Sequence, residues 1–122
     1  MKTKTEIIEE TAAFYNLGNR SAENSFCQYI SPMGKCCAFS RCCKDDKKTF
    51  QSLRYADREI GSLSEGNGDF MLPLLKEEYQ GHDWRFWRDI QNFHDDEENW
   101  DEEGLSLDGR TQKKTLLEKY ED

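Results

Sequence analysis

The sequence predicts a mainly helical α+β domain, with four or five helices around one core and a small β-hairpin in the cysteine-rich segment 26–43. Three observations support this. Apolar residues recur at helical spacing in both halves of the chain, alternation followed by a turn occurs between residues 26 and 34, and 122 residues suffice for one modest core. We therefore expect a single domain that spans residues 1–122.

The first predicted helix covers about residues 4–17. Thr3 and Glu6 stand at the spacing of a capping box, and Gly18 interrupts the helical pattern. The residues that return on one helix face are Ile7, Ile8, Thr11, Ala12 and Tyr15. The polar residues 18–25 that follow favour a surface loop.

Residues 26–43 contain all five cysteines. Phe26, Gln28 and Ile30 alternate as in a short strand, and residues 31–34 contain a proline and a glycine, which favour a turn. Residues 36–43 fit either a short helix or a second strand. We expect the rest of the domain to pack around this segment.

Weaker signals follow the cysteines. Polar residues 44–48 break the chain before a short helix over residues 49–55, and the glycine-rich stretch 61–68 predicts a flexible loop. The next helix begins either after Asp69, as N-cap, or near Leu72, because Pro73 is best tolerated in a first turn.

The long predicted helix covers about residues 84–98, with Asp83 as its N-cap. At about 100° per residue, five side chains share an arc of roughly 120° and form a core-facing stripe. These are Phe86, Trp87, Ile90, Phe93 and His94. Trp100 and residues 105–107 should fold back onto the stripe.

A C-terminal helix over about residues 109–120, capped by Asp108 or Thr111, completes the fold. Its apolar side chains should face inward. Together these elements predict a core that contains Ile8, Tyr15, Tyr29, Cys37, Phe39, Leu74, Phe86, Ile90 and Phe93.

The net charge of −8 is concentrated in one place. Residues 95–108 contain eight acids and no lysine or arginine, while the other 17 acids equal the 17 bases in number. This distribution disfavours direct nucleic-acid binding, because phosphates would be repelled. The segment is either a solvated helix end and loop or a docking face for a partner protein with a basic surface. The residues expected at that face are Asp95, Asp96, Glu97, Glu98, Trp100, Asp101, Glu102, Glu103 and Asp108.

The cysteines allow three interpretations. Their spacings do not match the paired CxxC motifs of zinc ribbons, and buried thiols that fill the core are the plainest reading. Cys27, Cys37 and His94 could instead hold zinc, since an imidazole on an apolar helix face needs a hydrogen-bond partner or a metal. An exposed redox-sensitive thiol is the third possibility.

Known catalytic patterns are missing from the sequence. It lacks a GxSxG elbow, a phosphate-binding glycine loop and an EF-hand spacing. His82-Asp83 and His94-Asp95 are reminiscent of His-Asp metal phosphohydrolases, but these need a further histidine that the chain does not have. The proximity of Trp84, Trp87 and Arg88 allows a small-molecule sponge with an aromatic pocket, although core packing explains the tryptophans equally well.

No long apolar run and no signal-peptide pattern occur, so we expect a cytoplasmic protein without membrane contact. The absence of a catalytic pattern favours a binding protein over an enzyme.

Several stretches together resemble a family of small phage- and prophage-associated bacterial proteins with a CxY, GxxCAxGR and LQxxHD pattern. They are 14–15, 27–29, 34–42, 83–87, 90–95, Trp100 and 105–106. Ser40 departs from the pattern, which has glycine there. The resemblance implies an accessory protein of a mobile element, made in a bacterial cytoplasm, that binds and inhibits a host or competitor protein.

Overall fold

A computed structural model describes residues 1–19, 22–23, 26–27, 37–61 and 63–121 of the chain, with backbone only for 22–23 and 26–27. The protein is a mainly helical α+β fold, as predicted. The described residues contain six α-helices instead of four or five, because α2 (Ala38–Arg41) and α4 (Gly68–Met71) are single turns that the sequence pattern does not resolve.

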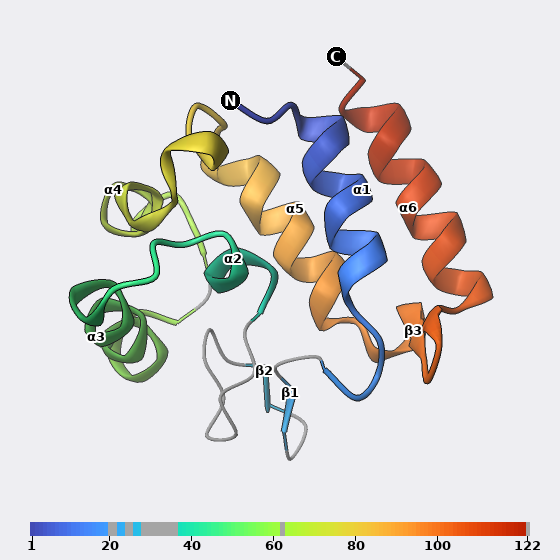
Figure 1. The fold of residues 1–122 in the computed structure, drawn as a ribbon, viewed down its shortest axis with the longest axis horizontal. Coiled ribbons are helices and arrows are strands. Elements are labelled where there is room, and N and C mark those ends of the chain that lie inside the picture. Colours follow the sequence, from blue (N-terminus) through green and yellow to red (C-terminus); the bar gives the residue numbers. More distant parts are fainter. Residues whose placement is uncertain (20–21, 24–25, 28–36, 62, 122) are drawn as a thin grey trace.

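Three longer helices form one side of the molecule. The helices α1 (Lys4–Phe14), α5 (Trp84–Asp95) and α6 (Leu107–Lys119) pack against one another, with both chain ends at the same end of this group (Figure 1). On the other side of α5 lie α2, α4 and α3 (Lys47–Tyr55), the last continued by the π-helical turn η1 (Ala56–Ile60). Two 3₁₀ turns, η2 (Leu72–Leu74) and η3 (Glu77–Tyr79), lead into α5.

The core lies between these helices, and α5 supplies its main stripe. All five predicted residues of the stripe are buried, including His94. Among the other predicted core residues, Leu74 is only partly buried and Tyr29 lies outside the described residues. The remaining predicted members are buried, namely Ile8, Tyr15, Cys37 and Phe39.

The first helix is shorter than predicted. Its capping box is confirmed, since the Thr3 side chain accepts from the Glu6 amide and the Glu6 carboxylate accepts from the Thr3 amide. It ends at Phe14 instead of residue 17. The Asn19 side chain donates to the Phe14 carbonyl and accepts from the Asn16 amide, so a turn closed by asparagine side chains replaces the last helical turn.

The hairpin begins earlier in the chain than predicted. Strand β1 (Ala22–Glu23), in a stretch expected to be a loop, pairs antiparallel with β2 (Phe26–Cys27). Residues 28–36, which include the predicted turn, lie outside the described residues. Of the two alternatives for residues 36–43, the short helix is the correct one. It forms as α2 because the Cys37 sulfur accepts from the Ser40 amide and the Gln91 side chain accepts from the Phe39 amide.

The glycine-rich segment is more structured than a loop prediction implies. The Asn67 side chain accepts from the Ser64 amide, and Leu63 and Asn67 are buried. Helix α4 then begins at Gly68, so the Asp69 cap is wrong, whereas the 3₁₀ turn η2 does begin at Leu72 with Pro73 in its first turn. Gly68 lies against Trp84 at the start of α5, and this contact favours a residue without a side chain.

The boundaries of the last two helices differ from prediction by a few residues. Asp83 caps α5 as expected, but the helix ends at Asp95 instead of residue 98. Four successive acids at a helix C-terminus oppose the helix dipole, and the Asp96 side chain instead caps a new turn, η4 (Glu97–Asn99). Helix α6 is capped by Ser106, not by Asp108 or Thr111.

Candidate functional site

The acidic segment covers the turn between α5 and α6. It contains η4 and a second hairpin in which β3 (Trp100–Asp101) pairs with β4 (Gly104–Leu105). The Asp101 side chain accepts from the amides of Glu103 and Gly104, and Gly104 has a positive φ of 147° that favours glycine. The Leu17 amide donates to the Asp101 carbonyl at 3.0 Å and ties the hairpin to the end of α1.

A network of backbone contacts fixes the position of this segment. The Ser106 hydroxyl donates to the Glu98 carbonyl, and the Asn99 side chain donates to the Phe93 carbonyl at 3.0 Å. Gly109 in α6 lies against the Asn99 carbonyl so closely that a Cβ atom would be 2.0 Å from that oxygen. The acidic side chains therefore project from a backbone that is bonded to the turn after α1, to α5 and to the N-cap of α6.

Seven of the eight acidic side chains in the segment are exposed. We call them the acidic surface: Asp96, Glu97, Glu98, Asp101, Glu102, Glu103 and Asp108. None of the seven forms an ion pair with a lysine or arginine among the described residues. Six lysines and arginines pair instead with Glu9, Glu10, Asp83 and Asp89.

A groove of about 440 Å³ borders the acidic surface. The turn contributes Asp101 and Glu103 to one wall, and α6 contributes Arg110 and Lys113 to another. Lys113 also pairs with Glu9 of α1 at 2.9 Å. The acidic surface therefore meets the basic side chains of α6 at this groove, which α1 also lines through Glu9, Ala12 and Ala13.

Trp100 was predicted to lie on the partner-facing surface, and this is wrong. Its side chain is only 3% exposed, packs against Tyr15 and Phe93, and donates its indole N–H to the His94 carbonyl at 3.0 Å. The expectation that Trp100 folds back onto the α5 stripe is correct, and the two expectations exclude each other. The apolar side chain that is exposed beside the acids is Leu107, at 79%.

Asp95 also differs from the other acids. Its carboxylate is partly buried and accepts from the Gln91 side chain at 2.9 Å, and it lies 2.8 Å from the His94 Nδ1. Asp95 therefore contacts side chains of α5 and is not part of the acidic surface.

Two of the three predicted metal ligands are described by the structure. Cys37 is fully buried, its sulfur caps α2, and burial raises the pKa of the thiol to about 12. His94 contacts the Tyr15 ring in addition to Asp95. Cys27 has a side chain outside the described part, and no cluster of three metal-binding side chains occurs within that part.

Trp84 and Trp87 have different surroundings among the described residues. Trp87 is fully buried against Phe39 and Phe86. Trp84 instead lies beneath two guanidinium groups, with the Cζ atoms of Arg85 and Arg88 at 5.0 and 5.3 Å from its ring centre. Core packing explains Trp87, and the small-molecule sponge stays a prediction.

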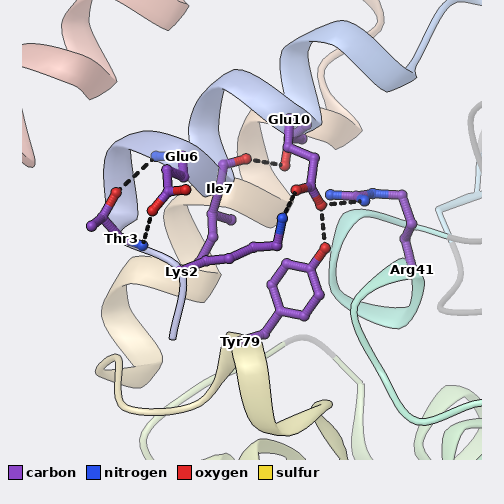
Figure 2. Close-up of polar contacts among 8 residues, drawn as sticks. Lys2, Thr3, Glu6, Ile7, Glu10, Arg41 and Tyr79 are labelled. Carbon is purple, nitrogen blue, oxygen red and sulfur yellow. Dashed lines mark hydrogen bonds and ion pairs between the residues drawn. The ribbon is translucent and has the colours of Figure 1, made fainter.

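A cluster around Glu10 was missed by sequence reasoning. The Glu10 carboxylate accepts from Lys2 and Arg41, each at 2.7 Å, and from the Tyr79 hydroxyl (Figure 2). Burial raises the pKa of Glu10, but the three hydrogen bonds outweigh it and hold the pKa at about 2. The only signal in the sequence is a carboxylate at the edge of an apolar helix face, between Ile7 and Thr11.

A second missed cluster joins α5 to the end of α6. Asp89 accepts from Lys119 at 2.7 Å, from the Tyr120 hydroxyl and from Arg88. Burial raises the pKa of Asp89, but these hydrogen bonds and charges outweigh it and lower the pKa overall. The cluster fixes α6, and through it one side of the acidic surface.

No protein-family model, curated protein or solved structure matches the chain. Among the helices in the described ranges, none has the length and apolar character that crossing a bilayer requires.

Proposed function

We propose that the chain is a non-enzymatic binding protein whose acidic surface docks onto a basic surface of a partner protein. The observation that carries this proposal is the exposure of seven acidic side chains that have no ion-pair partner among the described residues. Concentrated charge of one sign steers a partner of the opposite sign and raises the rate of association.

The hydrogen bonds that hold the backbone of the acidic segment support the same proposal. Carboxylates on a mobile tail lose side-chain and backbone entropy when they bind, whereas those on a fixed turn lose less. Asp96 and Asp101 hold their own turns through side-chain hydrogen bonds, and Ser106 caps the helix that follows. Leu107, exposed among the acids, adds an apolar contact to the surface.

The resemblance to phage and prophage proteins indicates which class of partner protein to expect. In this proposal the protein acts in a bacterial cytoplasm and inhibits a host defence or nucleic-acid-handling protein. A basic surface that normally holds DNA or RNA would be occupied by the carboxylates, and its usual ligand would be excluded. The chain itself would not contact nucleic acid, because its surplus charge repels phosphates.

The test compares two variants of equal net charge. The first neutralises the acidic surface by Asp96→Asn, Glu98→Gln, Asp101→Asn and Glu102→Gln, where asparagine keeps the oxygen that accepts the backbone bonds. The control neutralises four exposed acids elsewhere by Glu59→Gln, Glu65→Gln, Glu77→Gln and Glu118→Gln. Both change the net charge from −8 to −4.

Affinity capture from bacterial lysate at physiological salt, followed by quantitative mass spectrometry, gives the readout. A protein retained by the wild type and by the control variant, and lost by the acidic-surface variant, supports the proposal. Equal capture by all three proteins would show that the acidic surface only solvates the turn.

A further inference from the structure

The Arg41 guanidinium has hydrogen-bond donors without acceptors. Its side chain is 14% exposed, and one terminal nitrogen, Nη1, donates to Glu10 at 2.7 Å. The other two nitrogens, Nε and Nη2, are buried and have no acceptor among the described residues. Buried polar groups in proteins are almost always hydrogen-bonded, so an unpaired charged donor needs an explanation.

Glu10 cannot supply the missing acceptor. Its two oxygens already accept from Lys2, Arg41 and Tyr79, and its single negative charge is shared between two cations (Figure 2). The neighbouring Cys42 thiol does not compensate, because burial raises its pKa to about 12 and keeps it neutral. Above the guanidinium lies the Phe14 ring, with its centre 5.2 Å from Cζ.

The two unpaired nitrogens have a specific geometry. Nε–H and the adjacent Nη2–H of an arginine point in the same direction and match the two oxygens of a carboxylate or phosphate group. We infer that Arg41 anchors an oxyanion-binding site, in which a carboxylate or phosphate group accepts from both Nε and Nη2 while Nη1 stays on Glu10.

The Phe14 ring covers one face of the Arg41 guanidinium. Phe14 is 50% exposed and is the last residue of α1, so rotation of the ring away from the guanidinium sacrifices little buried apolar area. Once the ring has moved off the face of the guanidinium, the bound oxyanion accepts in the guanidinium plane, at the edge that carries Nε and Nη2. The site lies on α1 and α2, apart from the acidic surface, and does not depend on the function proposed for that surface.

Nuclear magnetic resonance of the wild-type protein tests the site directly. The Arg41 Nε–H signal is followed while sodium acetate or sodium phosphate replaces sodium chloride at constant ionic strength. A saturable shift is expected with at least one of them, and the anion with the larger effect distinguishes a carboxylate ligand from a phosphate ligand. At a concentration ten times the dissociation constant, the ratio of folded to unfolded protein should rise about 11-fold.

Arg41→Lys keeps the charge but removes the paired donors, so this variant should lose the anion-dependent stabilisation. Arg85→Lys, at an exposed arginine paired with Asp83, should retain it. If Arg41→Lys fails to fold, the wild-type titration decides alone. The proposal is overturned if neither anion gives a saturable shift of the Arg41 signal, or if Arg41→Lys is stabilised as much as the wild type.

Discussion

Glu10 connects three segments that are distant in the sequence. It lies on α1 and accepts from Lys2 in the N-terminal segment, Arg41 at the end of α2 and Tyr79 in η3. The N-terminal segment is further fixed because Lys2 donates its amide to the Glu78 carbonyl and its carbonyl contacts the His82 ring at 2.8 Å. One carboxylate thereby helps to hold the N-terminus, α2 and the approach to α5.

Removing the Glu10 charge should destabilise the fold. We expect Glu10→Gln to lower the free energy of unfolding by about 2 kcal/mol at pH 7, because hydrogen bonds to a charged, partly buried group are lost or weakened. Urea unfolding followed by circular dichroism measures the change. Glu9→Gln, at the neighbouring exposed residue that pairs with Lys113, is the control and should change stability by less than about 0.5 kcal/mol.

The same cluster predicts a pH dependence. The pKa of Glu10 falls from an ordinary value of 4.5 to about 2 on folding, so its stabilising contribution is complete above pH 4.5 and is lost as the pH falls towards 2. The difference in unfolding free energy between wild type and Glu10→Gln should therefore shrink across this range. If the two unfolding free energies differ by the same amount from pH 7 to pH 2, Glu10 does not make the hydrogen bonds described here.

Cys37 and Cys42 should behave as inert core thiols. Both are fully buried, and burial raises the pKa of each to about 12. Because thiolates are the species that react, iodoacetamide should modify these two cysteines only after denaturant is added, as mapped by mass spectrometry of peptides. Modification of Cys37 in the native protein at the rate of an exposed thiol would disprove this.

At the residue scale, the sequence indicated which side chains are buried but not which side chains hydrogen-bond to one another. Helical spacing identified the α5 stripe, because periodicity reports which side chains share a face. It did not identify the Glu10 contacts, whose donors are 8, 31 and 69 residues away. Trp100 was misplaced because composition around it is acidic, whereas its large apolar ring is better buried.

At the scale of elements, caps and close contacts determine where helices begin and end. Asp83 and the Thr3–Glu6 pair were recognisable because their spacing is local. Ser106 was missed, although serine is a preferred N-cap, because the helix was expected to begin later. The end of α1 depends on Asn19 and that of α5 on Asp96, side chains that replace helical bonds in ways that periodicity does not indicate.

Gly109 is the element-scale position where a substitution should be least tolerated. A Cβ atom there would stand 2.0 Å from the Asn99 carbonyl oxygen, so Gly109→Ala requires α6 to move away from the turn. We expect a loss of about 2 kcal/mol or more in the free energy of unfolding, measured by urea denaturation.

The control is Gly66→Ala. A Cβ at this position would meet only the Ser64 hydroxyl oxygen, at 4.0 Å, and the change should be small. Equal stability of the Gly109→Ala and wild-type proteins would mean that α6 does not pack on the turn as described.

For the whole molecule, the position of the surplus negative charge could be predicted from the sequence. The backbone structure that presents the acidic side chains could not. Counting acids and bases located the surplus between residues 95 and 108, and the exposure of most of these acids agrees with their charge. The hairpin that presents them has strands of only two residues, too short for an alternation pattern. The sequence also could not show that Lys2, Arg41, Lys113 and Lys119 pair with acids outside the acidic surface, because those pairs are made by tertiary contacts.

The most direct measurement is the association rate of a captured, purified partner with the two variants of equal charge, determined by surface plasmon resonance at low and physiological salt. At low salt we expect association with the acidic-surface variant to be about 10-fold slower than with the wild type or the control variant, and the difference to narrow as salt screens the charges. Equal association rates for the two variants at low salt would contradict the claim that this surface, instead of net charge alone, binds the partner.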